Sequence, residues 1–424
     1  MIGAGFFLAF LIVGVPIAFA LVALAVVIIL SSGNLILFQS FPQQFFGGLE
    51  NYGLIALPLF ILLGEFMNEG GIGRRLMALA LALLGSVRGG LAYVNLMANM
   101  MMAAILGSTV AQITIMSRIA VPEMVRAGYP RDVSVAITAA GGMLAPIIPP
   151  SMMFIIFGVI AQLPIGDLFI AGIVPGVILF AAFLAVIAWL GHKHNFPRNE
   201  KLAVRDRMIA VRDALPAAAI PVVIIGSILG GIATPTESAA IASVIAVLVG
   251  MFVYREMSFR DIWPAFIRAA ASSAVVLFLI AAAGLFSWVI TFENVPAIVS
   301  AWVQSLTSSP IVFLLLINAM LILLGMVTDP IPAIILVVPV FLPVAVGVYD
   351  IDPIQFGVIV CLNLTAGLLT PPVGTGLFTA ALMGQVRAER LARLIMPFFL
   401  ATAIVLLGLV FFPALSTGLG ALLS

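Results

Sequence analysis

The sequence predicts an all-α polytopic membrane protein. Of its 424 residues, 64% are apolar and 8% are charged, whereas soluble domains contain about 45–50% apolar and about 25% charged residues. The mean hydropathy is +1.31, so the chain has too little polar surface to be solvated as a globule of this length. Its long apolar runs are separated by short basic stretches, and runs of about 20 apolar residues cross a bilayer as helices.

Composition also excludes several classes of site. The N-terminal run GAGFFLAFLIVGVPIAFALVALAVVIIL has no basic residue before it and is long enough to span, which favours a retained helix over a signal peptide. Cys361 is the only cysteine, so an intrachain disulfide and a cysteine-based metal site are excluded. His192 and His194 lie in the polar stretch GHKHNFPRNEK, where a solvated role is favoured over metal binding. The net charge of +1 gives no indication of nucleic-acid binding.

Basic residues set the predicted topology. They fall in five groups, with none before Arg74 and none between Arg268 and Arg387. Because basic residues mark the cytoplasmic ends of spans, we thread the chain so that all five groups lie inside. The groups are 74–88, 118–131, 193–212, 255–268 and 387–393.

This threading has nine crossings and two re-entrant helical hairpins. Segment 90–125 has basic residues at both ends and is too short for two spans of about 20 residues each, so it is predicted to enter from the cytoplasm and return there. Segment 310–346 has no basic residue and is followed by Asp350 and Asp352, which predicts a hairpin that enters from outside. The crossings are predicted at 4–30, 53–69, 133–161, 166–190, 214–232, 237–254, 269–290, 354–386 and 394–420.

The predicted elements form an inverted-topology repeat. Two spans, a hairpin and two further spans occupy residues 1–190, starting inside, and the same order recurs in residues 237–424, starting outside. Residues 191–236 supply an amphipathic linker and a connecting span. Inverted repeats of this kind are typical of secondary transporters.

Each repeat contains two polar interruptions, one in the hairpin and one in the span that follows it. The interrupted segments are GSTVAQ (107–112), AAGGMLAPIIPPSMMF (139–154), GMVTDPIP (325–332) and NLTAGLLTPPVGTGLF (363–378). Ser108 and Pro149 are 41 residues apart, and Thr328 and Pro371 are 43 apart. The similar spacing argues against coincidence.

The interruptions predict ion and substrate sites. Non-helical backbone at membrane depth is tolerated only where it is buried in protein or lines a wet cavity. Unwound backbone exposes carbonyl oxygens that hold a small cation, and helix N-termini attract anions. Each hairpin tip with its unwound span thus predicts one cation site, with an anion between the two halves. The alternative is that glycine and proline only kink these helices for packing, which explains one break better than four in symmetric positions.

Asp329 is the only carboxylate deep in either hairpin. Intramembrane carboxylates are costly and are usually functional. The order Thr328, Asp329, Pro330 predicts a helix start with a capping side chain, and Ser108 and Thr109 predict similar caps in the first hairpin. Asp329 is a candidate sodium ligand, helix cap or proton carrier, and we favour the cap together with the electrostatics of a cation site.

Five segments carry a resemblance to a known family. They are GEFMNEGGIGRRL (64–76), GSTVAQ (107–112), APIIPPS (145–151), GGIATPTESAA (230–240) and LTPPVGTGLF (369–378). They resemble the large membrane subunit of TRAP transporters (tripartite ATP-independent periplasmic transporters), and together they span most of the chain. The sequence departs from the family at Gln112, where many members carry an acidic residue, so specificity is not transferred from close relatives.

The resemblance implies a sodium-coupled elevator transporter of the bacterial inner membrane, in which one bundle with both hairpins carries substrate past a scaffold bundle. It implies no cofactor beyond sodium as the coupling ion. The implied partners are a small four-helix membrane subunit, a soluble periplasmic substrate-binding protein and the surrounding lipid. The implied substrates are organic anions, either carboxylates, including sialic acid, or sulfonates.

By position, the resemblance implies two sodium sites and one substrate site. The first sodium site would use Ser108, Thr109, Gly141, Gly142 and Pro146. The second would use Thr328, Asp329, Gly367 and Thr370. The substrate would lie near Gln112, Ser151, Asn363, Thr375 and Gly376.

Two amphipathic segments, HKHNFPRNEKLAVRDRMIAVRDAL and YREMSFRDIWPAFIR, mix basic with apolar residues. They fit either interfacial helices that brace the scaffold or ordinary cytoplasmic loops. Two other functions remain open: a stand-alone ion-coupled dicarboxylate carrier or antiporter, and a channel or scaffold without coupled transport. No G-x-x-x-x-G-K-[ST] loop is present, which argues against ATP-driven transport, and no catalytic constellation indicates an enzyme.

Overall fold

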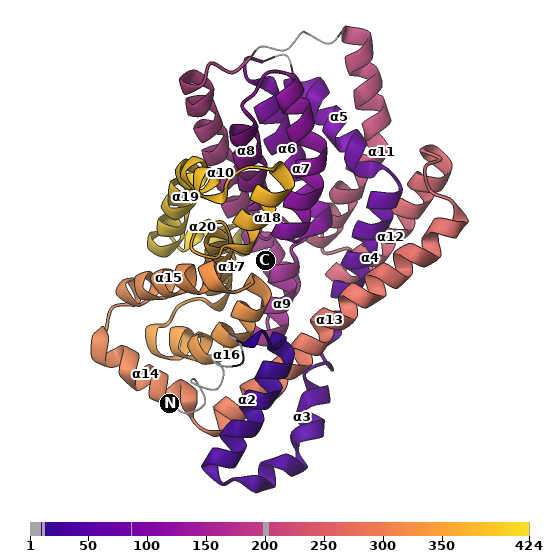
Figure 1. Cartoon of the computed structure of the whole chain (residues 1–424). Coiled ribbons are helices and arrows are strands. Elements are labelled where there is room, and N and C mark those ends of the chain that lie inside the picture. Colours follow the sequence, from indigo (N-terminus) through magenta and orange to yellow (C-terminus); the bar gives the residue numbers. More distant parts are fainter. Residues whose placement is uncertain (1–9, 11–12, 86, 198–202, 424) are drawn as a thin grey trace.

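The computed structural model describes residues 10, 13–85, 87–197 and 203–423 (Figure 1). Every regular element in these ranges is a helix. By length and composition, eight of the helices in this described part are able to cross a membrane. The predicted all-α multi-pass class is therefore confirmed.

The first hairpin and the first broken span occur where the sequence predicts them. Helices α6 (Gly90–Leu106) and α7 (Thr109–Arg126) join at Gly107, whose φ of +56° is a left-handed conformation that glycine adopts without strain. The broken span consists of α8 (Arg131–Gly142) and α9 (Met152–Ala161), with irregular backbone between them. α8 is buried from its second residue to its end, so it belongs to the protein core.

The second hairpin and broken span repeat this arrangement. Helices α15 (Pro310–Val327) and α16 (Pro330–Tyr349) join through Thr328 and Asp329. The broken span consists of α17 (Pro353–Leu368) and α18 (Thr375–Gly384), and α17 is buried from its third residue onward. Cys361 lies within α17 and is buried.

The hairpins and broken spans pack in a swapped pattern. Within each repeat, the hairpin packs against the first half of its own broken span: α6 and α7 against α8, and α15 and α16 against α17. Across the repeats, α7 packs against α18 and α16 against α9. Each hairpin therefore contacts the near half of one broken span and the far half of the other, as a two-fold relation between the repeats produces.

Direct backbone contact holds the second hairpin to its broken span. A Cβ placed on Gly367 would lie 2.8 Å from the Cα of Gly325, and a Cβ placed on Gly325 would lie 2.7 Å from the carbonyl oxygen of Leu364. The N–H of Gly374 donates to the carbonyl oxygen of Met326 at 2.8 Å. The chain therefore needs glycine here, because any side chain would push the tip away from the break.

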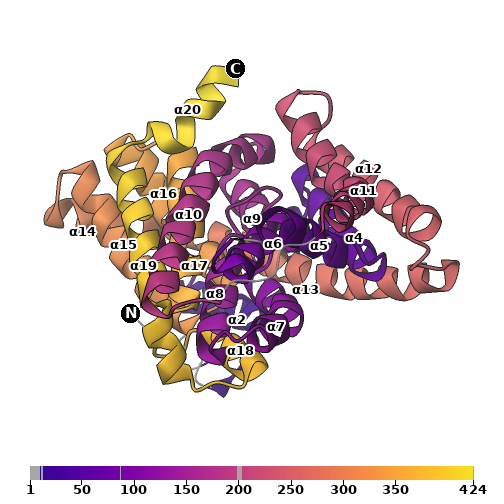
Figure 2. The same cartoon turned by 90° about the horizontal axis from the view of Figure 1, so that it is seen from above.

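Further helices complete the described part of the chain. They are α2 (Ile17–Ser32), α3 (Phe41–Gly47), α4 (Ala56–Glu69), α5 (Ile72–Leu84), α10 (Ile165–Lys193), α11 (Val204–Leu229), α12 (Pro235–Leu248), α13 (Phe259–Phe292), α14 (Val295–Leu306), α19 (Ala388–Phe411) and α20 (Ala414–Leu423), with short helical turns η1 (Leu35–Gln39), η2 (Tyr52–Ile55) and η3 (Val249–Val253). α13 runs obliquely past the core bundle and packs against α2, α3 and α4 (Figures 1 and 2). α4 in turn packs against α12, and α5 against α11.

Side-chain contacts link the five basic groups of the sequence to one another. Each contact joins a residue that belongs to one group, or lies beside it in the sequence, to a residue in or beside another group. The contacts are Arg88 with Asn195 (3.2 Å), Tyr129 with Phe196 (ring centroids 4.9 Å apart), Arg75 with Glu256 (2.7 Å) and Arg390 with Asp132 (2.5 Å). Arg75 holds the pKa of Glu256 below its usual value through a side-chain hydrogen bond. The predicted threading places these groups on one side of the membrane, and the contacts agree with it.

The amphipathic segments differ from the prediction. Neither forms a separate interfacial helix or a plain loop in the described residues, because α11 begins at Val204 and α13 at Phe259 and both continue into spans. Residues 4–9 and 11–12 of the first predicted span, and residues 198–202 of the first segment, lie outside the described residues.

Three further elements depart from the prediction. α5 and α14 are not predicted from the sequence, and each is a short helix beside a longer span. The prediction of a single span at 394–420 is wrong, because α19 ends at Phe411 and α20 begins after Pro413. Proline has no N–H and disfavours a helical residue before it, so the helix stops there.

We predict that Gly367→Ala destabilises the protein. The new methyl group would meet the backbone of Gly325 rather than a flexible side chain, and such overpacking costs about 1–3 kcal/mol of unfolding free energy. Thermal unfolding of the purified protein measures the loss. The matched control is Gly347→Ala on α16, where nothing lies within 4 Å of the added carbon, and equal midpoints for the two variants would contradict the contact.

Candidate functional site

The two hairpin tips and the two helix breaks meet at one cavity of about 310 Å³. Its lining comes from the two tips and from the ends of the broken helices. The lining residues are Gly107, Ser108, Thr109, Val110, Met152, Met153, Asp329, Pro330, Ile331, Leu368 and Thr375. Segments more than 200 positions apart in the sequence therefore share one site, which has the size of a small-molecule pocket.

Four helices begin at this cavity, namely α7, α9, α16 and α18. The first-turn N–H groups of a helix have no partner within the helix, and the aligned peptide dipoles place about half a positive charge at its N-terminus. Among the described residues that line the cavity, Asp329 is the one charged side chain. The positive potential in the site thus comes from backbone amides instead of lysine or arginine.

Asp329 occupies the N-cap position of α16 with Pro330 directly after it, as predicted. Its carboxylate makes no capping hydrogen bond, and neither does the hydroxyl of Ser108 at the N-cap of α7. The expectation that these side chains cap their helices is wrong for this structure. Ser108 and Asp329 instead both line the cavity.

The cavity brings together four of the predicted site residues: Ser108, Thr109, Asp329 and Thr375. The other ten lie around it without lining it. These are Gln112, Gly141, Gly142, Pro146, Ser151, Thr328, Asn363, Gly367, Thr370 and Gly376. All ten are buried except Thr370, which is half-buried.

In the first predicted sodium site, two of the carbonyl oxygens already accept hydrogen bonds from side chains. Nε2 of Gln112 donates to the carbonyl oxygen of Gly141 at 3.2 Å, and Oγ of Ser151 donates to that of Pro146 at 2.5 Å. Ser151 also accepts from the N–H of Phe154 at 3.2 Å and so caps α9. In this conformation, these oxygens hold the unwound segment together.

In the second predicted site, the two hydroxyl groups bond to their own helices. Oγ1 of Thr328 donates to the carbonyl oxygen of Leu324 at 3.0 Å, and Oγ1 of Thr370 donates to that of Ala366 at 2.8 Å. Each hydroxyl oxygen keeps lone pairs that accept a proton donor or a cation. The hydroxyl groups of Thr328 and Thr370 are therefore fixed by their own helices and keep unused acceptor lone pairs.

A buried amide network in the first hairpin is missed by the sequence analysis. Nε2 of Gln112 donates to both Oδ1 and the carbonyl oxygen of Asn99 at 2.9 Å, Nδ2 of Asn99 donates to Oδ1 of Asn95 at 2.8 Å, and Nδ2 of Asn95 donates to Oγ1 of Thr138 at 2.7 Å. Asn95 and Asn99 are four residues apart and so share one helix face. Two amides at that spacing in an apolar run are the signal that indicates such a network.

The second hairpin has a smaller counterpart of this network. Nδ2 of Asn363 donates to Oδ1 of Asn318 at 2.5 Å, which ties α17 to α15. Oδ1 of Asn363 and Oε1 of Gln112 are buried and accept no hydrogen bond from the described residues. Gln112 and Asn363, both predicted near substrate, therefore join a hairpin to a broken helix in this structure.

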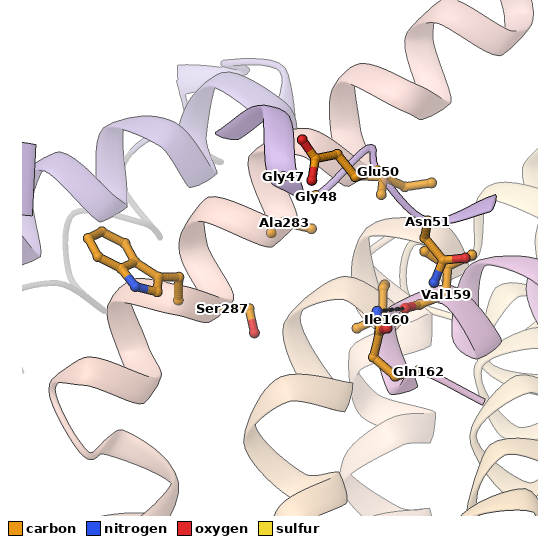
Figure 3. Close-up of a pocket in the computed structure, with 12 residues that line it drawn as sticks. Gly47, Gly48, Glu50, Asn51, Val159, Ile160, Gln162, Ala283 and Ser287 are labelled. Carbon is orange, nitrogen blue, oxygen red and sulfur yellow. Dashed lines mark hydrogen bonds between the residues drawn. The ribbon is translucent and has the colours of Figure 1, made fainter. Parts of the chain in front are cut away.

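A second cavity, of about 470 Å³, lies between α13 and the C-terminal end of α9 (Figure 3). Its polar lining includes Glu50, Asn51, Gln162 and Ser287. Glu50 is the one charged residue among the described lining residues, and no helix of eight or more residues begins there. An anion would be repelled by this carboxylate without compensation, so the cavity at the hairpin tips is the better anion site.

The fold is that of a class of membrane transporters. The structure of the YdaH transporter of Alcanivorax borkumensis aligns with a TM-score of 0.66 at 17% identity, over 93% of this chain and 90% of that one. MtrF of Neisseria gonorrhoeae, which is described as illuminating a class of antimetabolite efflux pumps, aligns with a TM-score of 0.60 at 13% identity, over 90% of this chain and 85% of MtrF. At these identities the likeness concerns the fold alone.

Sequence similarity gives the family. The family described as "Tripartite ATP-independent periplasmic transporter, DctM component" matches residues 4–415, and the chain belongs to it. The 2,3-diketo-L-gulonate TRAP transporter large permease protein YiaN of Escherichia coli is 37% identical over 410 residues, covering 95% of this chain and 94% of YiaN. The sialic acid TRAP transporter large permease protein SiaM of Vibrio cholerae is 33% identical over 415 residues, covering 97% and 96%.

A further relative is longer than this chain. The isethionate TRAP transporter permease protein DctMQ of Oleidesulfovibrio alaskensis is 38% identical over 416 residues, which are 97% of this chain and 65% of DctMQ. The resemblance stated from sequence motifs is thus confirmed, and the chain is a TRAP transporter large permease subunit. As a permease it is a transport protein and not an enzyme.

We predict that Gln112→Leu lowers the stability of the protein. The leucine removes the donor shared by the Asn99 and Gly141 oxygens, and unsatisfied buried acceptors cost about 1–3 kcal/mol. The control is Gln304→Leu, because Gln304 bonds Ser300 on the exposed face of α14. Thermal unfolding should shift for Gln112→Leu alone, and a shift of the same size for both would argue against the network.

Proposed function

We propose that this permease subunit imports an organic anion together with sodium. The observation that carries the proposal is the cavity where four helix N-termini and one carboxylate meet without a lysine or arginine among its lining residues. Helix N-termini bind carboxylates and sulfonates through their free N–H groups and dipoles. Transporters with discontinuous helices use this device for anionic substrates and use unwound carbonyls for sodium.

Asp329 supplies the reason for a coupling cation. Two like charges about 4 Å apart repel by about 4 kcal/mol at the effective dielectric constant of a partly exposed site. An anion bound in the cavity would face that repulsion from Asp329, and a sodium ion held between them removes it. Sodium would thereby raise the affinity for the anion, and the anion would raise the affinity for sodium by the same factor.

The two proposed sodium sites lie behind the tips. The first comprises Ser108, Thr109, Gly141, Gly142 and Pro146, and the second comprises Thr328, Asp329, Gly367 and Thr370. A Cβ placed on Gly142 would lie 3.4 Å from the carbonyl oxygen of Thr109, so tip and break are close enough in the first repeat to share one ion. In the second repeat the contact between Gly325 and Gly367 supports the same arrangement.

The substrate class follows from charge and from the relatives. Similar permeases are named for isethionate, 2,3-diketo-L-gulonate, sialic acid and C4-dicarboxylate, and all four are organic acids. The proposed substrate is a carboxylate or sulfonate bound by the N-termini of α9 and α18, near Ser151, Thr375 and Gly376, with Gln112 and Asn363 shaping the site from behind.

Movement is proposed to follow the elevator scheme in the bacterial inner membrane. The bundle of hairpins and broken spans would move as one body against the helices around α13, and each inverted repeat, residues 1–190 and residues 237–424, would contribute helices to both groups. The cavity between α13 and α9 supports this division, because close packing is interrupted between the two groups of helices.

Two partners complete the proposed system: a small four-helix membrane subunit and a periplasmic substrate-binding protein. The extra length of DctMQ beyond the region that this chain matches supports the first. The alternative is a stand-alone carrier with the same fold. Co-purification of a small helical subunit with this chain decides between the two.

We predict that Asp329→Asn weakens sodium-dependent uptake and leaves assembly intact. The amide keeps the shape of the side chain and removes the charge that favours a cation beside it. Uptake of the substrate by proteoliposomes that contain the complete system, measured with and without a sodium gradient, gives the result. Asp350→Asn, in the turn after the second hairpin, is the matched control, and unchanged sodium dependence in Asp329→Asn would refute the role.

We further predict that Ser108→Ala and Thr328→Ala each raise the sodium concentration needed for half-maximal uptake. Losing one oxygen ligand of about 1 kcal/mol corresponds to a shift of about fivefold. A sodium titration of uptake measures the shift. Ser305→Ala, at the exposed end of α14, should titrate like the parent protein, and an unshifted curve for both tip variants would exclude these cation sites.

A further inference from the structure

A basic hollow shares no lining residue with the transport cavity. It has a volume of about 930 Å³ and is formed where α8 begins, α18 ends and α19 begins. The lining residues are Arg131, Asp132, Gln385, Val386, Arg387, Glu389, Arg390 and Arg393. None of them belongs to the proposed sodium or substrate sites.

The hollow has excess positive charge. Four arginines against two carboxylates give a formal charge of +2. Asp132 is already used, because it pairs with Arg390 at 2.5 Å, and Arg131 donates to Oε1 of Gln385 at 3.1 Å. Among the described residues, Arg387 and Arg393 form no ion pair with a carboxylate, although Glu389 lies between them in the sequence.

An exposed apolar stripe runs along α19 from the edge of this hollow. Met396, Leu400, Ile404, Leu407 and Phe411 follow Arg393 at helical spacing, and they are between 45% and 69% exposed. The 18 steps from Arg393 to Phe411 rise about 27 Å along the helix, close to the thickness of about 30 Å of a bilayer's hydrocarbon core. The stripe therefore has the length of a membrane-facing surface, and Arg393 lies at its end.

We propose that the hollow binds the phosphate headgroup of an anionic phospholipid, with an acyl chain along the apolar stripe of α19. Arginine guanidinium groups pair with phosphate oxygens through two parallel hydrogen bonds, and basic pockets between helices at the cytoplasmic side recruit anionic lipids. A soluble anion fits the arginines alone, whereas a lipid uses both the arginines and the stripe that begins at Arg393.

The location gives such a lipid a structural effect. Residues of α8 and α19 both line the hollow, and Arg390 with Asp132 is the direct link between them. A bound phosphate beside Arg387 and Arg393 reduces the repulsion among the four arginines. The inference depends on the proposed cytoplasmic orientation of this end but not on transport activity, so loss of sodium-driven uptake leaves it standing.

The test measures lipid retention by native mass spectrometry. The full chain is purified from nanodiscs that contain equal amounts of phosphatidylglycerol and phosphatidylcholine. The double variant Arg387→Gln and Arg393→Gln should lower the ratio of retained phosphatidylglycerol to phosphatidylcholine by about fivefold per arginine, which corresponds to about 1 kcal/mol for each basic residue near an anionic membrane surface. The variant Arg387→Lys and Arg393→Lys should keep most of the preference.

Arg126→Gln is the matched control, because Arg126 is exposed and pairs with Glu123 on α7 outside the hollow. It should retain lipid like the parent chain. An unchanged ratio in the glutamine double variant would overturn the proposal. Displacement of phosphatidylglycerol by millimolar glycerol phosphate would overturn it as well, since the hollow would then be a site for soluble anions.

Discussion

The structure depends on one constraint: unwound backbone inside a membrane protein has to find partners within the protein. Four segments of this chain unwind or turn between helices, and the following contacts close three of them. Oγ of Ser151 donates to the carbonyl oxygen of Pro146. The N–H of Gly374 donates to the carbonyl oxygen of Met326, and the backbone of Gly325 contacts the backbone of Gly367. Without these contacts, unwound backbone groups would be left without partners inside the protein.

The same constraint explains why the site carries so few charges. Arginine and lysine are costly at membrane depth, and in this chain the basic groups are joined to one another away from the hairpin tips. Backbone amides supply positive potential without that cost, because the peptide dipoles of the four helices that begin at the cavity place partial positive charge at their N-termini. The single carboxylate of Asp329 then sets the balance of charge in the cavity.

Much of this architecture is predictable because its signals are local. The tips and breaks follow from glycine, proline and serine within apolar runs, and the structure has them at Gly107, Asp329 and the two Pro-Pro segments. The N-terminal boundary of α13 cannot be predicted from the local sequence, because the amphipathic start and the apolar span that follows it are both compatible with a helix. The bond from Asn363 to Asn318 depends on how two helices are rotated in the folded bundle, and no pattern within either segment fixes that rotation. The missing caps at Ser108 and Asp329 have the same origin, because a local rule cannot say whether a side chain bonds its helix or borders a cavity.

The swapped packing of the repeats gives the proposed coupling a physical route. Helix α7 of the first hairpin packs against α18, and helix α16 of the second packs against α9. Each tip also contacts the half-helix of its own repeat, because Gly107 lies against Met152 and the carbonyl oxygen of Met326 accepts from the N–H of Gly374. An ion that orders one tip would therefore fix the position of an N-terminus on the opposite side of the substrate cavity. Both ions would act on the same lining, and neither half of the anion site would be complete while one tip remained free. Such an arrangement couples two cations to one anion through shared helix ends, without any direct contact between the two ion sites.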